Sequence, residues 1–191
     1  MAHTATGPAV TRYSPVSIGF HWMIALSVLA TAALGIWLDG LGYYDPWQPR
    51  ALWMHRAIGT SAFFLMLLKL FWRLYDRKPP LEKALTRFEA IAATATHHIL
   101  TLAVLVLPIT GYLVSTSSGS AVPLAFGLEL PALVQVGNAL RDGLMQAHVV
   151  IAYGLLALVG IHAMAAVKHQ VLDGGQTLQR MLPGRRPLGD R

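Results

Sequence analysis

The sequence predicts an all-α membrane protein, a transmembrane four-helix bundle with antiparallel, up-and-down helices. Apolar residues make up 54% of the 191 residues and charged residues only 13%, against about 25% charged in a soluble domain. Four stretches with few or no charges have the length of about 20 residues that a helix needs to cross a bilayer. The chain has no cysteine, which excludes a disulfide scaffold and thiolate chemistry.

Each stretch predicts one helix. The first, over residues 20–38, and the fourth, over residues 147–167, contain no Lys, Arg, Asp or Glu. The second is apolar until Lys69 and Arg73, whose stems can lie in lipid while their charges reach the interface. The third contains Pro108 and Gly111, which should bend it and which neighbouring helices tolerate. We expect one membrane domain over residues 1–191, with spans at about 18–39, 55–75, 92–115 and 146–169.

The remaining segments differ in character. The loop over residues 115–146 is long, and we expect a short interfacial helix in it at about residues 130–144. The tail over residues 173–191 contains Gly, Pro and Arg. Such a composition is typical of a solvated extension.

Positive residues gather on one side of the predicted bundle, where the opposite side has only Arg50, Arg56 and Arg141. Because positive loops stay in the cytoplasm, we expect both termini there. The net charge of +6 is then explained by the orientation in the membrane and by attraction to anionic lipid. No nucleic acid is expected as a partner, since no basic stripe is interleaved with aromatic residues. The twelve residues of the positive side are Arg12, Lys69, Arg73, Arg77, Lys78, Lys83, Arg87, Lys168, Arg180, Arg185, Arg186 and Arg191.

Seven of the eight histidines lie in or at the ends of the predicted helices, where an ionisable side chain is costly and points to function. His148 and His162 are 14 residues apart, so they share one helix face and are separated by about 21 Å. In an antiparallel bundle, His21 lies level with His162, and His55 lies level with His148. The sequence therefore predicts two cross-helix imidazole pairs, one near each membrane face.

Two such pairs predict two haems, because a low-spin iron takes one neutral imidazole on each side of the porphyrin. Zinc needs more ligands than two, and no Asp or Glu lies at helical spacing to supply them. Glycines near these positions suit a large flat ligand, although small residues also pack membrane helices together; they are Gly19, Gly59, Gly154 and Gly160. A haem-free transporter or scaffold is the alternative, but its polar residues should line a path instead of forming pairs at equal depths.

Several short motifs, in this order, carry a resemblance to a known family: Tyr13-Ser14, His21-Trp22, Met54-His55, the Lys69 and Arg73 end of the second helix, Leu107-Pro108-Ile109-Thr110-Gly111, Phe126-Gly127-Leu128, Pro131, His148, Gly160-Ile161-His162-Ala163, His169 and Leu178-Gln179-Arg180-Met181-Leu182-Pro183. The sequence resembles the bacterial cytochrome b-561 family, in one branch of which superoxide oxidase activity is described. The resemblance implies a multi-pass protein of the bacterial inner membrane with two non-covalent b-type haems. It also implies that His21 pairs with His162 and His55 with His148, as the depth argument predicts.

In light of that resemblance, the sequence predicts a ubiquinone site at the inner face that consists of His97, His169 and Arg73. Lys168 lies at a similar depth. An imidazole and a cation can hydrogen-bond quinone oxygens and supply protons. On the outer side, Arg56 and Arg141, together with Arg50, can draw superoxide towards the haem. Acidic residues share that face and oppose this attraction; they are Asp39, Asp45, Glu129 and Asp142.

The leading hypothesis is a superoxide:ubiquinone oxidoreductase that oxidises superoxide to oxygen and passes the electrons through two bis-His haems. Because two imidazoles close both axial positions of each iron, the chemistry must be outer-sphere electron transfer. The alternative is a non-catalytic cytochrome b subunit that links a periplasmic redox protein to the quinone pool. The loop over residues 115–146 is long enough to be its docking surface.

Overall fold

The computed structural model describes residues 12–76, 79–80 and 86–182. Within this part of the chain, four helices are each long and apolar enough to span a membrane, which confirms the predicted all-α four-helix architecture. Only 6% of the most apolar window of the first and of the fourth helix is buried. The apolar surfaces of these two helices are therefore left for lipid. The helices are α1 (Pro15–Gly40), α2 (Gln48–Trp72), α3 (Arg87–Thr116) and α4 (Asn138–Val171).

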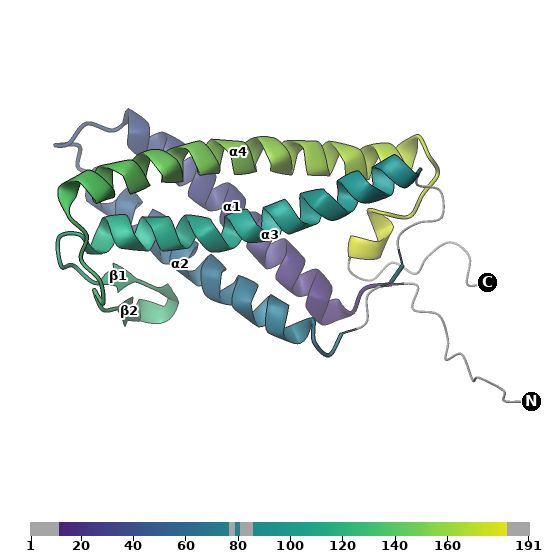
Figure 1. The fold of residues 1–191 in the computed structure, drawn as a ribbon, viewed down its shortest axis with the longest axis horizontal. Coiled ribbons are helices and arrows are strands. Elements are labelled where there is room, and N and C mark those ends of the chain that lie inside the picture. The colour runs from purple at the N-terminus through teal and green to yellow at the C-terminus, as the bar shows by residue number, and fades with distance from the viewer. Residues whose placement is uncertain (1–11, 77–78, 81–85, 183–191) are drawn as a thin grey trace, which may run out of the picture.

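The helices form two antiparallel hairpins that cross each other. Helix α1 packs along α2, α3 packs along α4, and α2 joins the two hairpins by packing against α3. Figure 1 shows the α1–α2 hairpin running diagonally behind the α3–α4 hairpin. One residue from each helix meets in the buried core, namely Ile24, Met66, Val104 and Leu155. This core layer lies between the two ends of the bundle, where the histidines gather.

Local sequence signals explain where the helices begin. Ser14 caps α1 by accepting a hydrogen bond from the Ser17 amide, and Pro15 occupies the first turn, where its missing N–H is not needed. Thr86 and Glu89 form a reciprocal capping box at the start of α3. Helix α3 then continues through Pro108 as one element.

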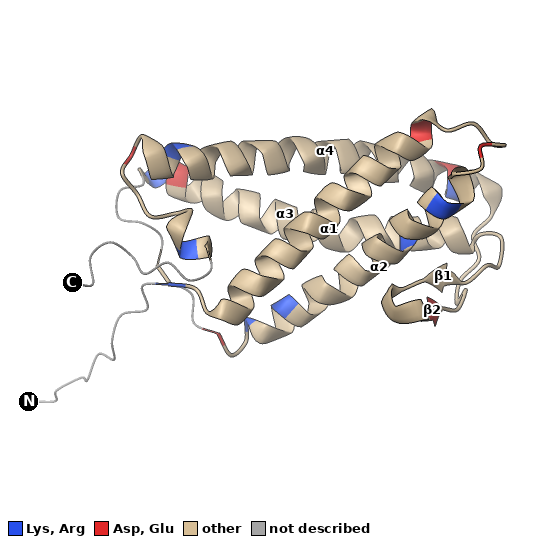
Figure 2. Ribbon diagram, turned by 180° about the vertical axis from the view of Figure 1, so that it is seen from behind, with Lys and Arg blue, Asp and Glu red and all other residues tan. Residues whose placement is uncertain are grey.

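We call the end of the bundle that holds His55 and His148 the His55 end, and the opposite end the His21 end. The Arg12 guanidinium hydrogen-bonds to the Leu182 carbonyl, so the first and the last described residues meet at the His21 end. Figure 2 shows charged residues concentrated at the two ends, with little charge on the helices between them. Six residues of the predicted positive side lie outside the described residues, namely Arg77, Lys78, Lys83, Arg185, Arg186 and Arg191.

The segment between α3 and α4 differs from the prediction. The expected interfacial helix at residues 130–144 is wrong for its first half, because α4 begins only at Asn138. The preceding residues form a small antiparallel hairpin of β1 (Val122–Pro123) and β2 (Glu129–Leu130), joined by the short 3-10 helix η1 (Ala125–Gly127). Pro131 explains the difference, since proline restricts the preceding residue and cannot donate within a helix.

The described part of the tail also differs from the predicted solvated extension. Residues up to Leu182 fold back over α1 and include the 3-10 helix η2 (Gln179–Met181). The Trp22 indole N–H donates to the Met181 carbonyl at 2.6 Å. The apolar side chains of Leu178, Met181 and Leu182 favour this packing, because burying them removes apolar surface from water.

Candidate haem-binding site

The structure brings His55 of α2 and His148 of α4 together at one end of the bundle. Their ring centres are 6.1 Å apart and their planes are inclined by 65°. Both side chains are half-buried. The two residues lie 93 positions apart in the sequence, so only the packing of the two helical hairpins makes them neighbours.

Each of these imidazoles is held by a helix that carries neither of them. His55 Nδ1 lies 3.0 Å from the Thr31 carbonyl oxygen of α1, and His148 Nδ1 lies 3.1 Å from the Leu107 carbonyl oxygen of α3. The Thr110 hydroxyl is also 2.9 Å from His148 Nδ1 and donates to the same Leu107 carbonyl. In both cases a peptide carbonyl fixes the orientation of the ring.

A glycine four residues after each carbonyl makes this approach possible. A Cβ added at Gly35 would lie 3.4 Å from His55 Cε1, and a Cβ added at Gly111 would lie 3.2 Å from His148 Cε1. A side chain on a helix leans over the turn that precedes it. A residue other than glycine would therefore crowd the His148 ring at Gly111, whereas at Gly35 its Cβ would come into van der Waals contact with the His55 ring.

The hydrogen bonds also determine which nitrogen is available to a metal. When Nδ1–H donates to a carbonyl oxygen, the imidazole is neutral and the lone pair lies on Nε2. Metal-binding histidines usually have this second bond, which fixes the tautomer and makes the ligand more basic. His55 and His148 are therefore prepared to bind a metal through Nε2.

The His21 end holds three imidazoles. The ring centres of His21 and His162 are 6.4 Å apart, and the ring centre of His97 of α3 is 5.3 Å from that of His162. Trp22 meets the His21 ring edge to face at 5.4 Å. His98 faces away, is exposed, and bonds to the Thr94 carbonyl of its own helix. The sequence left open which of His97 and His98 faces the bundle, and the structure selects His97.

The side chain of Lys69 also differs from its expected position. We expected its charge to leave the bundle for the interface, but its ammonium interacts electrostatically with the three imidazoles of His21, His97 and His162. Helical periodicity could have identified it, because Lys69 continues the stripe of the buried residues Ala62 and Met66. A cation therefore lies beside this imidazole cluster.

Both predicted pairs have the spacing of a shared metal ion. With a metal–nitrogen bond of about 2 Å on each side, two imidazoles that share one ion have ring centres about 6 Å apart. The observed separations are 6.1 Å and 6.4 Å. Of the glycines predicted near the ligands, Gly19, Gly154 and Gly160 have nothing within 4 Å of an added Cβ, whereas a Cβ at Gly59 would lie 3.8 Å from Thr31 Cγ2. The residues present fit a bis-imidazole haem at each end.

The other residues predicted at the His21 end fall into two groups. Arg73 interacts electrostatically with His97 and with Tyr13, whose pKa is raised by burial. His169 instead pairs with Asp173 at 2.6 Å, and Lys168 bridges Asp173 to Glu89 at 3.0 Å and 2.8 Å. Hydrogen bonds from Lys168 and then from His169 lower the pKa of Asp173. Arg73 and His97 therefore lie near the His21–His162 pair, whereas His169 belongs to an ionic network.

The arginines predicted to attract superoxide differ in their surroundings. Arg141 is exposed and makes two hydrogen bonds to the carboxylate of the adjacent Asp142, at 2.7 Å and 3.0 Å. That ion pair cancels much of its field at a distance. Arg56 directly follows His55, is half-buried, and makes no ion pair with a described residue. Along the chain, Arg56 is therefore closer to His55 than Arg141 is to His148.

Four membrane-spanning helices with imidazole pairs at both ends define a membrane electron-transfer protein that binds b-type haem. Comparison with known proteins gives the family: the family model described as Prokaryotic cytochrome b561 matches residues 12–184, and the chain belongs to this family. It is therefore a multi-pass bacterial membrane protein.

Curated relatives match along nearly their whole length. Cytochrome b561 homolog 2 of Escherichia coli (strain K12) is 32% identical over 171 residues, which cover 90% of this chain and 91% of the relative. Probable superoxide oxidase CybB of Yersinia pestis is 30% identical over 177 residues, covering 92% and 98%. Cytochrome b561 homolog 1 of Escherichia coli (strain K12) is 24% identical over 180 residues, covering 93% and 100%.

Proposed function

We propose that this chain is a dihaem cytochrome b that oxidises superoxide and reduces ubiquinone. In this proposal His55 and His148 bind one haem, and His21 and His162 bind the other. The observation that carries it is the spacing of the two imidazole pairs, 6.1 Å and 6.4 Å between ring centres. The name of the Yersinia pestis relative, probable superoxide oxidase CybB, supports the choice of superoxide as donor.

We further propose that the His21 end faces the cytoplasm and that the membrane is the bacterial inner membrane. The described cations support this orientation, since positive residues favour the cytoplasmic side. Arg12, Arg87, Lys168 and Arg180 lie at or beyond the helix ends at the His21 end, whereas Arg50, Arg56 and Arg141 lie at the other.

When bound, the two haems supply one-electron transfer between the two ends of the bundle. The backbone carbonyls of Thr31 and Leu107 orient the imidazole rings of His55 and His148. The buried layer of Ile24, Met66, Val104 and Leu155 keeps water out of the middle of the bundle. Two superoxide ions release two electrons and two molecules of oxygen, and one ubiquinone takes up these electrons with two protons to give ubiquinol.

Quinone reduction is assigned to the His21 end. His97 is the third imidazole of that cluster, and Arg73 and Lys69 interact electrostatically with it. A quinone oxygen that gains electrons accepts hydrogen bonds more strongly, so an imidazole and a cation stabilise it and supply a proton. His169 lies two turns beyond His162 and can relay protons to this end through its contact with Asp173.

An assay on the purified chain in lipid tests this function. The absorption spectrum is expected to show a Soret band with two haems per chain, and superoxide with a ubiquinone analogue is expected to give quinol without any other protein. His97→Ala is expected to slow quinone reduction while both haems remain. Quinone kinetics that do not change in this variant would remove His97 from the site.

The second candidate function is an electron-transfer subunit that receives electrons from a periplasmic redox protein. One observation favours it: the Arg141 guanidinium is neutralised by Asp142, which weakens the attraction of superoxide to that face. In this case the isolated chain keeps its haems but reduces quinone only in the presence of a co-purified partner. The superoxide assay without added protein therefore separates the two candidates.

A further inference from the structure

The hairpin between α3 and α4 runs back along the bundle instead of leaving it. At the end of α3, the Thr116 hydroxyl donates to the Val134 carbonyl at 2.8 Å. One turn deeper, the Tyr112 hydroxyl donates to the Pro131 carbonyl at 2.7 Å and accepts from the Leu133 amide at 2.9 Å. These contacts lead the segment from the His55 end towards the middle of the bundle.

The turn of the hairpin reaches the middle of α2. The Ala125 amide donates to the Ser61 hydroxyl at 3.1 Å. Ser61 is six residues beyond His55 in the direction of the His21 end, about 9 Å further along the helix axis. It lies in the uncharged stretch of α2 between Arg56 and Lys69. The turn therefore lies at the level of the membrane-spanning part of α2.

Several polar backbone groups of this segment have partners of the kind that a lipid environment demands. Where water is absent, each peptide N–H and C=O must bond within the protein. Side chains of α2 and α3 supply several of these bonds, through Ser61, Tyr112 and Thr116. Within the turn, the Leu124 amide donates to the Leu128 carbonyl at 2.7 Å.

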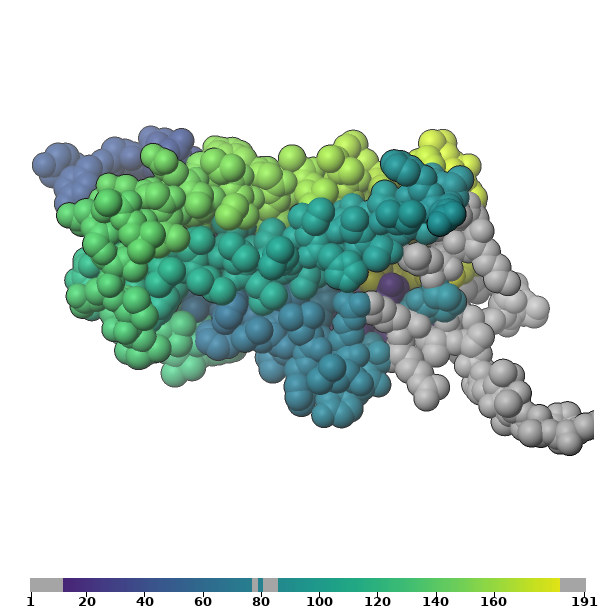
Figure 3. All heavy atoms as spheres, viewed as in Figure 1, coloured from purple at the N-terminus to yellow at the C-terminus, as the bar shows by residue number. Residues whose placement is uncertain are grey.

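Apolar side chains at the turn point away from the protein. Phe126 is 99% exposed and Leu128 is 59% exposed, and α2 carries further exposed apolar residues, Leu67 and Leu68. Phe126 also has φ 61°, a left-handed conformation that is unfavourable for a bulky residue. Figure 3 shows the green atoms of this segment beside the blue atoms of α2, so the two form one continuous surface.

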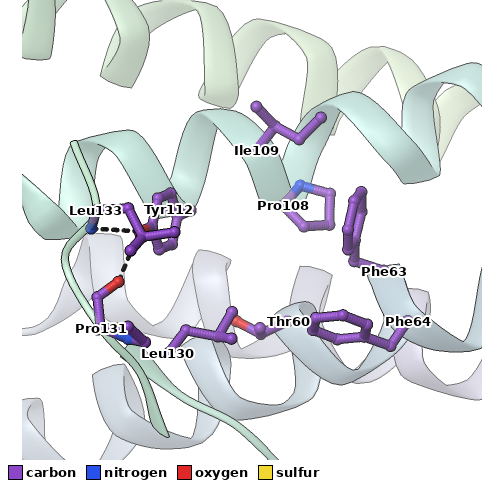
Figure 4. A pocket seen from close by; sticks show the side chains of 9 residues that line it. All are labelled: Thr60, Phe63, Phe64, Pro108, Ile109, Tyr112, Leu130, Pro131 and Leu133. Atoms are coloured by element: carbon purple, nitrogen blue, oxygen red, sulfur yellow. Dashed lines mark hydrogen bonds between the residues drawn. The ribbon is translucent and has the colours of Figure 1, made fainter. Parts of the chain in front are cut away.

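A pocket of about 190 Å³ lies between the hairpin segment, α2 and α3. Figure 4 shows that its wall is almost wholly apolar, and that Tyr112 turns its hydroxyl towards the loop backbone. Six of the residues that line it are Thr60, Phe63, Pro108, Tyr112, Leu130 and Leu133. Such a wall at membrane depth suits acyl chains.

We propose that this hairpin is a lipid-embedded element, with Phe126 and Leu128 inserted among the acyl chains of the leaflet at the His55 end. Glu129 is exposed and limits the depth, because its carboxylate must reach the headgroups. In this position the acyl chains cover the phenyl ring of Phe126, which the protein leaves exposed.

A spin label at Phe126 tests this placement. The chain contains no cysteine, so Phe126→Cys introduces a single site for labelling. In lipid bilayers, the label is expected to collide with oxygen, which concentrates among acyl chains, several-fold more than with a water-soluble nickel chelate. Leu68→Cys, on the exposed apolar face of α2, is the control for a lipid-facing site. Ser120→Cys, exposed on the same segment before β1, is the control for a water-facing site.

The proposal holds when the ratio of oxygen to nickel collisions at Phe126→Cys equals that at Leu68→Cys. A ratio equal to that at Ser120→Cys would overturn it, since the hairpin would then stand in water. Low collision rates with both reagents would also overturn it, because another protein surface would then cover the turn. The phenyl group of Phe126 makes almost no contact within the chain, so this variant is expected to keep its circular dichroism and its melting temperature.

Discussion

At the His55 end, each imidazole donates to a helix carbonyl near a glycine. At the His21 end, the imidazoles of His21 and His97 lie close to that of His162, and none of the three hydrogen-bonds to a described residue. A cation, Lys69, interacts with the second group. Hydrogen bonds to carbonyls make imidazole ligands more basic and favour oxidised iron, and a nearby cation favours reduced iron. For the proposed haems, the electron is therefore more stable at the His21 end.

The largest expected effect comes from removing a ligand. His148→Ala is expected to lower the haem content from two to one per chain and to leave the haem of the His21 end, because a bis-His site with one imidazole loses half of its axial bonds. Haem quantification per chain measures this. His162→Ala is the matched variant and is expected to remove the other haem. If either variant keeps two haems, the proposed pairing is wrong.

Filling the space beside His148 is expected to act on one end only. In Gly111→Leu, the new side chain meets the His148 ring, which lies 3.2 Å from the position of an added Cβ. Overpacking of this kind costs about 1–3 kcal/mol, which corresponds to a loss of about 5-fold to 150-fold in haem affinity. Haem titration of the purified variant measures the loss at the His55 end.

Gly143→Leu is the control for that variant, since Gly143 lies on the same helix as His148 and has nothing within 4 Å of an added Cβ. Equal loss of haem in Gly111→Leu and Gly143→Leu would show that the contact with the ring is not the cause.

Removing the positive charge of Lys69 is expected to have a moderate effect on the difference in reduction potential between the two proposed haems. Lys69→Met keeps a side chain of similar length and removes the positive charge. The reduction potential of the haem at the His21 end is expected to fall by about 60 mV, which is a factor of ten for one electron. Redox titration followed by absorption measures it, and the potential at the His55 end serves as the internal reference. A potential that rises in this variant would contradict the proposed role of Lys69.

The smallest effect is expected in the ionic network that joins α3 and α4 at the His21 end. The pKa of Asp173 lies below its ordinary value of 3.8, because Lys168 and His169 bond to its charged form. The contribution of Asp173 to stability is therefore complete above that pH and is lost as the pH falls below it. Asp173→Asn is expected to lower the melting temperature slightly at pH 7, and this effect is expected to shrink at a pH below 3.8, as the pH falls through the lowered pKa.

Melting curves at the two pH values measure this difference. A network that contributes nothing would give the same melting temperature in Asp173→Asn and in the original chain at both pH values. Since the group is exposed, the shift is expected to be smaller than those of the haem-site variants.

The four helices, and the histidines that lie at equal depth, could be predicted from the sequence alone. Both follow from one-dimensional properties: the length of apolar stretches is matched to the bilayer, and residues 14 apart on a helix share a face. The pairs of His55 with His148 and of His21 with His162 could be predicted for this reason. The family resemblance of the chain was also visible in its short motifs, and the match over residues 12–184 confirms it.

The hydrogen bonds that hold the imidazoles became visible only in the three-dimensional fold. Thr31 and Gly35 meet His55 across the α1–α2 contact, and Leu107 and Gly111 meet His148 across the α3–α4 contact. Such contacts depend on the rotation of each helix about its axis and on the height of one helix against the next. Those quantities follow from the packing of all side chains together, and the sequence pattern of a single helix does not contain them. For the same reason, no local sequence pattern predicts that the hairpin of β1 and β2 contacts Ser61 of α2.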